Sequence, residues 1–511
     1  MTKYFYITTP IYYVNDVPHI GHAYTTLAAD VLARFKRLDG YDVKFLTGTD
    51  EHGQKVAKSA ALVGMTPQAF TDKVSQSFRD LCMTMNYSND DFIRTTEPRH
   101  YRAAQALWDK LIARGEIYLD KYAGWYAVRD EAFYGEDELR EEGGKKIAPS
   151  GAECEWVEEE SYFFRLSAWQ ERLLKYYEDH LDFIAPASRR NEVISFVKGG
   201  LKDLSVSRTT FSWGVPVPGS DKHIMYVWLD ALTNYITVLG YPDVTTEMKN
   251  FWPTTVHLVG KDILRFHAVY WPAFLMAAEL TPPRRIFANG WWMAEGQKMS
   301  KSLGNVIAPQ QLVDSYGLDQ TRYFLLRDVP FGNDGDFSHA QMIARVNAEL
   351  ANNIGNLVQR TLSFIQKNAG AAVPRPGEYQ PQDERLLNQI EQSLADIREN
   401  MDRQEFHKAL ESILALAAAA NVYIDAEAPW TLKKTDSARM TTVLYVLCEI
   451  IRALGFLLLP FMPDSAGKIL DAVAVALNKR TYEYYGKVTA LVPGTPLPAP
   501  QPIFPRFESI K

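Results

Sequence analysis

Apolar and polar positions follow two different periods in the first part of this 511-residue chain. Short apolar runs bounded by polar or turn-forming residues predict buried strands at 4–8, 43–47 and 256–259. Apolar residues three to four positions apart predict helices at 101–114 and 263–275, and an earlier one with Leu27, Val31, Phe35 and Leu38 on one face. Strands that alternate with helices predict a parallel α/β sheet of the Rossmann type.

The pattern changes between residues 116 and 200, where aromatic and acidic residues are mixed, as in Glu155-Trp156-Val157-Glu158-Glu159. Because strand and helix alternate again afterwards, we expect a domain inserted between two halves of one sheet. Beyond residue 340 the pattern is helical, with long apolar-periodic stretches at about 384–424 and 436–459, which predicts a helical bundle. The proline-rich run after residue 491 predicts an extended surface tail.

These changes divide the chain into five regions. The two halves of the α/β sheet are predicted at 1–115 and 201–285, on either side of an inserted connective domain at 116–200. A region with a lysine-bearing loop follows at 286–345, and an α-helical domain with an extended tail at 346–511. Hydrophobic residues make up 47% of the chain, enough to supply cores for several domains.

Composition and cysteine usage predict a cytoplasmic protein that does not enter a membrane. No apolar run approaches the roughly 18 to 20 residues of a membrane span, and the N-terminus lacks the pattern of a secretory signal. Cys82, Cys154 and Cys448 lie far apart in sequence and form no close metal-ligand pair. They favour a reducing compartment over a disulfide framework.

A histidine pair lies where the first strand leads into its helix, in Pro18-His19-Ile20-Gly21-His22. The N-terminus of a helix offers unpaired backbone N–H groups and the positive end of the helix dipole. Two imidazoles three residues apart add side-chain donors, and Gly21 lets the backbone approach a ligand closely. His19, Gly21 and His22 are therefore candidates for binding phosphate oxygens.

A second basic signature, Lys298-Met299-Ser300-Lys301-Ser302, lies in a stretch of small and polar residues from 296 to 305 that predicts a mobile loop. Attack on the α-phosphate of ATP gathers negative charge on phosphate oxygens and departing pyrophosphate, and two mobile ammonium groups suit that transition state. The pentapeptide alone is equally compatible with an ordinary solvated loop. Together, the two signatures predict a nucleotide held from both ends.

Four further segments occur in the order found in one enzyme family. They are Tyr6-Ile7-Thr8-Thr9-Pro10-Ile11-Tyr12-Tyr13-Val14-Asn15, Thr47-Gly48-Thr49-Asp50-Glu51-His52-Gly53, Trp228-Leu229-Asp230-Ala231 and Gly260-Lys261-Asp262-Ile263. With the two basic signatures, they make the chain resemble the methionyl-tRNA synthetases, a class I aminoacyl-tRNA synthetase family, over nearly its whole length. The resemblance implies a Rossmann-type catalytic domain, a connective domain for the tRNA acceptor stem and a helical anticodon-binding domain.

The resemblance also implies an activity. It is the ATP-dependent conversion of L-methionine to methionyl-adenylate, with magnesium on the phosphates, followed by transfer of methionyl to the 3′ end of tRNA(Met), including the initiator. The residues implied as catalytic are His19, His22, Lys298 and Lys301. Those implied for ATP binding are His19, Gly21, His22, Gly260, Asp262, Lys298, Ser300 and Lys301. For Asp262, a carboxylate that stabilises a helix start is the alternative.

Two helical stripes carry the candidate amino-acid pocket. One contains Trp228, Ala231, Leu232 and Tyr235, and the other contains Ile263, His267 and Trp271. Periodicity alone is typical of core packing. The resemblance implies instead that these stripes, with Ile11 and Tyr13, line a pocket for a thioether, whose sulfur suits aromatic edges. Asp50 would receive the α-ammonium, with Arg208 beside Asp50 or the substrate carboxylate; a turn cap is the alternative for Asp50.

The resemblance assigns the anticodon to Asn356, Arg360 and Trp430. The first two are four residues apart, so an amide and a guanidinium share one helix face, while Trp430 can stack an unpaired base. The alternative is a surface pair and a packed tryptophan.

The net charge of -7 is unfavourable for RNA binding unless basic residues gather locally. Candidates for such a track are Arg322, Arg327, Arg345 and Arg360. Their irregular spacing leaves scattered solvated charges as the alternative.

Many members of this family carry zinc in the inserted domain, on paired Cys or Cys/His ligands. Here Ala127 and Asp130 occupy the first pair, and neighbours of Ile147 and Ser150 the second. We therefore expect no structural zinc. The lack of a C-terminal appendage favours a monomer.

Three other functions stay open at this point. A nucleotidyltransferase could share the histidine signature, but it would not need the lysine loop, the insertion and the helical half together. A non-catalytic tRNA-binding relative would have disrupted phosphate-binding residues. A synthetase for leucine, isoleucine or valine would need more than these roughly 85 inserted residues for an editing domain.

Overall fold

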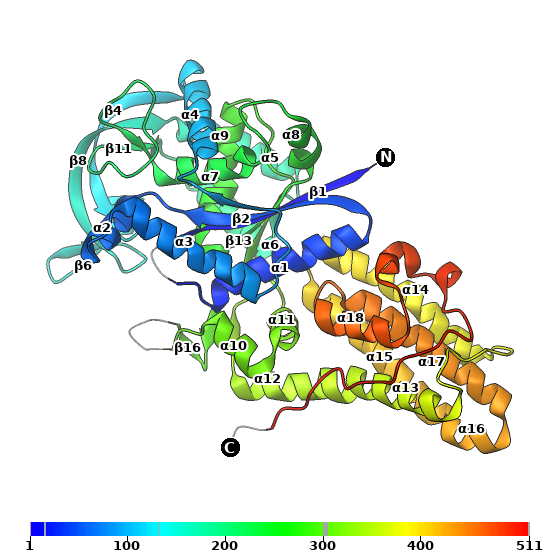
Figure 1. The fold of residues 1–511 in the computed structure, drawn as a ribbon. Coiled ribbons are helices and arrows are strands. Elements are labelled where there is room, and N and C mark those ends of the chain that lie inside the picture. Colours follow the sequence, from blue (N-terminus) through cyan, green and yellow to red (C-terminus); the bar gives the residue numbers. More distant parts are fainter. Residues whose placement is uncertain (1, 15–16, 131, 300–304, 509–511) are drawn as a thin grey trace.

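Six parallel strands form the central sheet of the computed structural model, in the order β3-β2-β1-β13-β14-β9. Their bounds are β1 Lys3–Tyr13, β2 Tyr41–Asp50, β3 Asp91–Arg94, β9 Ile184–Ala185, β13 Val256–Gly260 and β14 Arg285–Asn289. The structure describes the chain apart from residues 1, 15–16, 131, 300–304 and 509–511 (Figure 1). Strand order reverses between β1 and β13, where the carboxyl ends of the strands form a ligand crevice. The predicted Rossmann-type sheet is confirmed.

Helices cover both faces of this sheet, because alternate residues of its strands point to opposite sides (Figure 1). Phe5 and Ile7 pack with the apolar face of α1, whereas Tyr6 packs with α4, α7 and α9. The helices of this part are α1 Ile20–Leu38, α2 Gln54–Leu62, α3 Pro67–Thr84, α4 Pro98–Ala113, α5 Gln170–Asp179, α6 Ala187–Lys198, α7 Val227–Thr237, α8 Thr246–Phe251 and α9 Trp271–Ala277.

The helix predicted at 263–275 is instead three elements. A single 3₁₀ turn, Lys261–Ile263, leads to a π-helical stretch, Phe266–Tyr270, before α9 begins at Trp271. Pro272 explains the wide turn, because it has no N–H to donate to the preceding turn and its ring needs space there.

The inserted part is built on two long antiparallel strands, β4 Ile117–Ala127 and β8 Glu153–Phe164. Shorter strands extend it: β5 Ala132–Tyr134, β6 Arg140–Glu142, β7 Lys145–Ile147 and β10 Leu204–Ser205. The predicted limit at residue 200 is not a single cut, since β9 rejoins the parallel sheet before it and β10 pairs with β8 after it. Two-residue strands have no periodicity that a sequence could show.

A small apolar cluster lies inside the insertion, formed by Ala127, Ala148, Ala152 and Cys154. Asp130 accepts hydrogen bonds from the hydroxyls of Tyr134 and Ser150. Among the described residues, no group of three or more His, Cys, Asp or Glu side chains is placed to hold a metal ion.

Between the sheet and the helical part lies a three-stranded sheet of β15 Trp292–Ala294, β16 Gln297–Lys298 and β17 Gly335–Phe337. A two-stranded ladder, β11 Ser207–Arg208 and β12 Ile224–Met225, comes directly before α7, which carries the first predicted pocket stripe and is called the pocket helix below. The stretch predicted as a loop from 296 therefore begins in a strand, β16.

The helical part contains α10 Pro309–Tyr316, α11 Leu318–Arg327, α12 His339–Arg345, a π-helical stretch Val346–Gly355, α13 Asn356–Asn368, α14 Pro381–Asp402, α15 Phe406–Glu427, α16 Pro429–Thr435, α17 Ser437–Leu458 and α18 Pro463–Ala472. By length and apolar composition alone, two stretches could cross a membrane, 406–435 and 437–458. The second is 94% buried and packs against α14, α15 and α18, as a core helix of a bundle does. The predicted bundle is confirmed, and the tail beyond it runs extended beside α12 and α13 (Figure 1).

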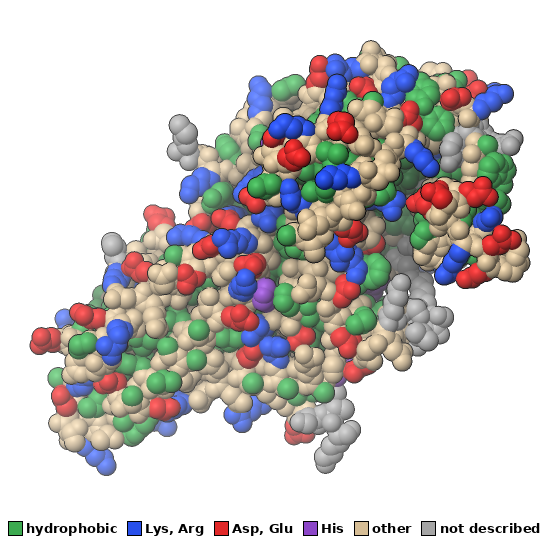
Figure 2. Space-filling model, turned by 180° about the vertical axis from the view of Figure 1, so that it is seen from behind, with side chains coloured by type: hydrophobic (Ala, Val, Ile, Leu, Met, Phe, Trp, Pro, Cys, Tyr) green, Lys and Arg blue, Asp and Glu red, His purple; other side chains and the backbone are tan. Residues whose placement is uncertain are grey.

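The predicted basic track is wrong at Arg322. Its guanidinium is fully buried and donates to Asp30 at 2.7 Å and to the carbonyls of Met85 and Phe461. Arg322 thereby joins α1 to the turn before α18, a role that helical periodicity cannot distinguish from surface exposure. Positive and negative side chains are interspersed over the face in Figure 2.

Candidate active site

His19 and His22 lie together at the start of α1, with ring centroids 3.9 Å apart. His19 is the N-cap, and its Nδ1 accepts the backbone N–H of Gly21 at 3.0 Å. The backbone N–H of His19 donates in turn to Nδ1 of His22 at 3.1 Å. The two rings therefore satisfy backbone N–H groups at the helix terminus.

This capping fixes where the imidazole protons lie. Burial, and then the neighbouring His19, lower the pKa of His22 well below its usual value, so the ring is neutral. A neutral ring whose Nδ1 accepts a hydrogen bond carries its proton on Nε2. The same reasoning applies to His19, whose Nδ1 also accepts a hydrogen bond, so both rings carry the proton on Nε2.

Gly21 has a local role that the sequence did not reveal. A Cβ atom added there would lie 2.9 Å from Cε1 of His19, closer than a real side chain allows. A larger residue at position 21 would therefore have to displace the capping ring.

The region of the lysine signature lies next to the histidines. The backbone N–H of Ile20 donates to the carbonyl of Ile307 at 3.0 Å, which ties the start of α1 to the chain after the signature. Lys298 pairs with Met293 in the β15–β16 ladder. The predicted residues Ser300, Lys301 and Ser302 lie outside the described residues, as does the side chain of Lys298.

Gly260 and Asp262 lie at the carboxyl end of β13, beside the crevice. A Cβ atom on Gly260 would lie 2.5 Å from Oδ1 of Asp262, so a larger residue here would displace that carboxylate. The indole N–H of Trp291 donates to that same oxygen at 3.1 Å. Thr25 of α1 donates to Asn289 at 3.1 Å. No motif or periodicity pointed to Trp291 or Asn289.

The two predicted pocket stripes meet. The hydroxyl of Tyr235 and Nε2 of His267 are 2.7 Å apart, and His267 Nδ1 lies 3.0 Å from the carbonyl of Ile263. A carbonyl only accepts, so Nδ1 carries the proton and Tyr235 donates to Nε2. Burial lowers the pKa of His267 to about 4, which keeps the ring neutral.

One apolar cluster contains six of the nine predicted pocket residues, namely Leu232, Tyr235, Trp271, Ile11, Trp228 and Ile263. Trp228 stacks on Phe266 with ring centroids 3.7 Å apart, and the Tyr235 ring lies 6.2 Å from that of Trp271. Phe266 is an aromatic neighbour that the stripes did not predict.

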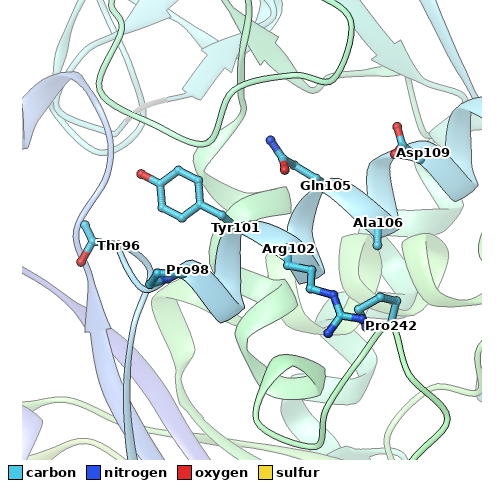
Figure 3. Close-up of a pocket in the computed structure, with 8 residues that line it drawn as sticks. All are labelled: Thr96, Pro98, Tyr101, Arg102, Gln105, Ala106, Asp109 and Pro242. Carbon is cyan, nitrogen blue, oxygen red and sulfur yellow. The ribbon is translucent and has the colours of Figure 1, made fainter.

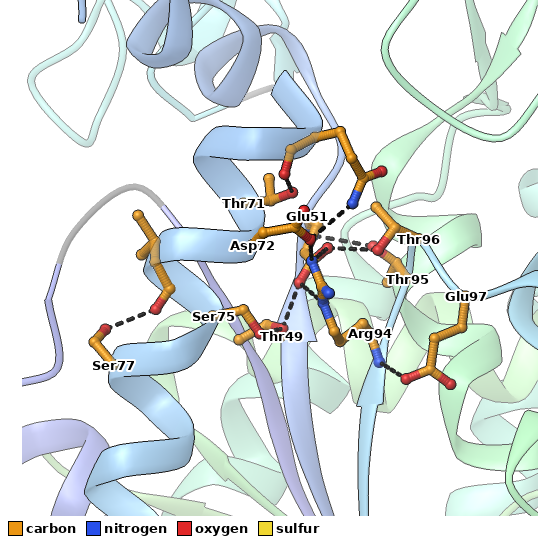
Figure 4. Close-up of polar contacts among 12 residues, drawn as sticks. Thr49, Glu51, Thr71, Asp72, Ser75, Ser77, Arg94, Thr95, Thr96 and Glu97 are labelled. Atoms are coloured by element: carbon orange, nitrogen blue, oxygen red, sulfur yellow. Dashed lines mark hydrogen bonds and ion pairs between the residues drawn. The ribbon is translucent and has the colours of Figure 1, made fainter. Parts of the chain in front are cut away.

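Asp50 ends β2 and pairs with Tyr13 of β1, so both predicted residues lie at the carboxyl edge. The next residue, Glu51, is fully buried. Its two carboxylate oxygens accept hydrogen bonds from the Arg94 guanidinium at 2.6 and 2.9 Å. Hydroxyls of Thr49 and Thr96 complete this network (Figure 4). It fixes the chain directly after Asp50.

Arg208 is buried on β11, beside the insertion. Its guanidinium donates to the Ser205 hydroxyl at 2.9 Å and to the carbonyl of Ser207 at 2.7 Å. It also lies 4.9 Å from the Phe133 ring and 4.7 Å from the Tyr226 ring.

A second group of predicted residues meets on the helical part. Arg360 of α13 lies with its guanidinium 5.5 Å from the Trp430 ring and donates to Asp425 at 2.7 Å. Asn356 is exposed one turn earlier on α13, and Trp430 is 44% exposed. The amide, the guanidinium and the indole therefore share one open surface.

Two family models match the chain, one after the other. Residues 5–362 match a family model described as tRNA synthetases class I (M), and residues 373–510 match one described as the anticodon binding domain of methionyl tRNA ligase. The chain is 56% identical over 504 residues to the methionine–tRNA ligase of Brucella suis biovar 1, covering 98% of each chain. It is 56% identical over 511 residues to that of Rickettsia conorii, covering 99% of this chain and 100% of the relative. It is similar to the solved Mycobacterium tuberculosis methionyl-tRNA synthetase in complex with methionyl-adenylate, with a TM-score of 0.96 and 50% identity over 99% of this chain and 100% of the other.

Proposed function

Because the chain belongs to the class I methionyl-tRNA synthetases, we propose how its residues divide the two steps of that reaction. The enzyme activates L-methionine with ATP to methionyl-adenylate and pyrophosphate, and then transfers methionyl to the 3′ end of tRNA(Met). The roles given below to individual residues are proposals.

The histidine pair holds ATP. His19 and His22 present neutral Nε2–H donors to phosphate oxygens, next to the backbone N–H groups at the start of α1. Gly21 keeps the His19 ring in place, while Gly260 and Asp262 meet the ribose. Lys298, Ser300 and Lys301 approach the phosphates from the other side and stabilise the charge that develops during attack.

ATP enters as its magnesium complex, with the metal held by the phosphates and by water. The methionine carboxylate attacks the α-phosphorus in line, and pyrophosphate leaves from the opposite side. No side-chain nucleophile is needed, so positioning and charge stabilisation account for the acceleration.

Methionine binds between the two stripes. The pocket consists of Ile11, Tyr13, Trp228, Ala231, Leu232, Tyr235, Ile263, His267 and Trp271. Asp50 receives the α-ammonium as a charge-assisted hydrogen bond. Arg208 supports Asp50 or the substrate carboxylate.

The single observation that carries this proposal is the Tyr235–His267 contact, together with the apolar cluster that holds Tyr235 and Ile11 of β1. It provides an apolar pocket with one fixed polar contact for a thioether. The test is amino-acid-dependent exchange of pyrophosphate into ATP across all candidate amino acids. Methionine alone should support fast exchange; a comparable rate with leucine would contradict the pocket assignment.

We further propose that Asn356, Arg360 and Trp430 read the anticodon of tRNA(Met), including the initiator, and that a monomer acts in the cytoplasm. Each proposed site lies within one chain, and all three cysteines are free thiols. The apolar cluster around Ala127 supports an insertion without structural zinc. Light scattering, and charging of initiator and elongator tRNA by the purified enzyme, test these points.

A further inference from the structure

A second stripe of α7 is polar yet buried. Asp230, Thr233, Asn234 and Thr237 follow helical spacing, and none of the four is more than 4% exposed. This stripe lies on the same helix as Trp228, Ala231, Leu232 and Tyr235, here called the methionine stripe. The helix packs on α4. Buried polar groups at such a place need partners, and those of Asp230 are both histidines.

The Asp230 carboxylate uses one oxygen for each histidine. Oδ2 lies 2.6 Å from Nδ1 of His52, and Oδ1 lies 2.6 Å from Nε2 of His100. A carboxylate accepts, so each histidine donates an N–H. Burial raises the pKa of Asp230, but the two histidines outweigh it and lower the pKa to about 2.

The two histidines come from different elements. His52 follows Asp50 by two residues, whereas His100 belongs to α4. Nε2 of His52 lies 3.0 Å from the hydroxyl of Tyr101, and Nδ1 of His100 lies 3.2 Å from that of Thr237. One carboxylate therefore connects the segment after β2, the pocket helix and α4.

The hydrogen-bonded chain from Asp230 through His52 ends at Tyr101, which reaches the surface. Tyr101 lines a surface cavity of about 660 Å³, together with Thr96, Pro98, Arg102, Gln105, Ala106, Asp109 and Pro242. Figure 3 shows the Tyr101 ring on the α4 wall of this cavity. Asp230 is at the interior end, on α7 itself.

Other contacts hold the same segment, but to different neighbours. The Glu51 carboxylate is held by Arg94 of β3 (Figure 4). The indole N–H of Trp213 donates to the Glu51 carbonyl at 2.6 Å. The backbone N–H of Gly53 donates to the Trp213 carbonyl at 3.1 Å. The His52–Asp230 hydrogen bond differs because it reaches the pocket helix itself.

We propose that Asp230 is a positioning residue which, through His52, sets the distance between the ammonium-binding Asp50 and the methionine stripe of α7. The two subsites lie on separate elements, yet one substrate must fill both. A displacement of about 1 Å between such groups can cost roughly 100-fold in rate. This inference rests on the proposed role of Asp50, and its test separates the two.

Two matched ligands isolate the ammonium subsite. Methioninol keeps the thioether and the ammonium, whereas 4-(methylthio)butan-1-ol lacks only the ammonium. Asp230→Asn and His52→Gln should each lower the affinity for methioninol by roughly 10-fold or more, because a charge-assisted contact is misplaced. The affinity for 4-(methylthio)butan-1-ol should stay within about twofold of the wild-type value. In pyrophosphate exchange the same variants should raise KM for methionine and leave KM for ATP unchanged.

His100→Gln is the matched control. It removes the other histidine from the same carboxylate but keeps the His52–Asp230 contact, so the ratio of the two ligand affinities should stay at the wild-type value. If Asp230→Asn does not fold, the comparison of His52→Gln with His100→Gln decides the question.

Each outcome bears on one claim. If Asp50→Asn leaves the ligand ratio unchanged, the proposed role of Asp50 fails. If Asp50→Asn changes the ratio but Asp230→Asn and His52→Gln do not, Asp50 stands and the positioning role is wrong. If Asp230→Asn lowers the affinity for both ligands equally, Asp230 supports the fold in general and the inference is also overturned.

Discussion

His19 donates its backbone N–H to Nδ1 of His22, so one ring of the histidine pair completes the helix cap that the other ring begins. The edges of Tyr12 and Phe78 lie against the His22 ring, with centroids 4.8 and 5.3 Å away. The contacts that form the start of α1 therefore also orient the rings of His19 and His22. In the proposed role, both rings are therefore oriented before ATP binds, as transition-state stabilisation requires.

Two substitutions at His22 separate capping from phosphate binding. His22→Asn places an acceptor near the Nδ1 position and loses the distal donor, whereas His22→Gln places an amide N–H near the Nε2 position. We expect His22→Asn to lower kcat for pyrophosphate exchange by roughly 100-fold, as for the loss of an oxyanion donor, and His22→Gln by roughly 10-fold. Far-ultraviolet circular dichroism should be unchanged in both. Near-normal exchange by His22→Asn would show that the distal N–H is not used.

Tyr235→Phe removes the donor to Nε2 of His267 while the ring stays in the apolar cluster. A buried acceptor left without its partner costs about 1–3 kcal/mol. We expect KM for methionine to rise by roughly 5- to 100-fold, with KM for ATP unchanged. Tyr6→Phe is the control, because its hydroxyl donates to the backbone carbonyl of Tyr235 rather than to the pocket. An equal rise in both variants would mean that helix stability, not the pocket contact, is measured.

His267 should make stability depend on pH. Its pKa falls from 6.5 unfolded to about 4 folded, mainly because burial disfavours the charged ring. Between these values the unfolded chain binds the extra proton, so the free energy of unfolding is fully retained above pH 6.5 and falls as pH drops toward 4. The contribution is about 3 kcal/mol at most.

Urea unfolding of wild type and His267→Gln at several values of pH across this window measures the effect. The curve of the variant should be flatter. Burial also lowers the pKa of His22 and His257, so only the difference between the two proteins reports His267. Parallel curves would contradict the assignment.

The strands, the stripes and the histidine pair at a helix start could be predicted, because each is a local pattern of apolar or basic residues. Trp228 and Tyr235 share a face by helical spacing alone, and their helix forms as expected. The hydrogen bond from Ile20 to Ile307, in contrast, joins residues far apart in the chain and has no local signal. The same is true of the contact from Thr25 to Asn289.

Buried charged residues were the hardest to place from the sequence. Arg322 follows the same helical pattern as an exposed arginine, and only its partner Asp30, on a distant helix, explains why it is inside. Asp230 is a similar case, since its two histidines come from elements that sequence spacing does not bring together. A buried ion is specified by its partners, which lie outside any local window.

Arg322→Met tests how strongly that ion pair joins α1 to the helical part. Removing the guanidinium leaves Asp30 with Arg34 and Ser88, and leaves the carbonyls of Met85 and Phe461 without a donor. We expect the free energy of unfolding in urea to fall by about 3–5 kcal/mol. The double variant with Asp30→Asn should lose less than the sum of the single losses, because no lone charge stays buried. Additive losses would show that the two groups are not coupled.

Trp430→Ala should separate tRNA recognition from methionine activation. Stacking of a base on an aromatic ring is worth about 1–3 kcal/mol, so KM for tRNA should rise by roughly 5- to 100-fold while pyrophosphate exchange stays at the wild-type rate. Trp430→Phe keeps an aromatic face beside Arg360 and should recover most of the loss. The two assays use one enzyme preparation, so a loss in both would indicate misfolding rather than lost recognition. An unchanged KM for tRNA in the alanine variant would mean that this exposed indole does not meet the anticodon.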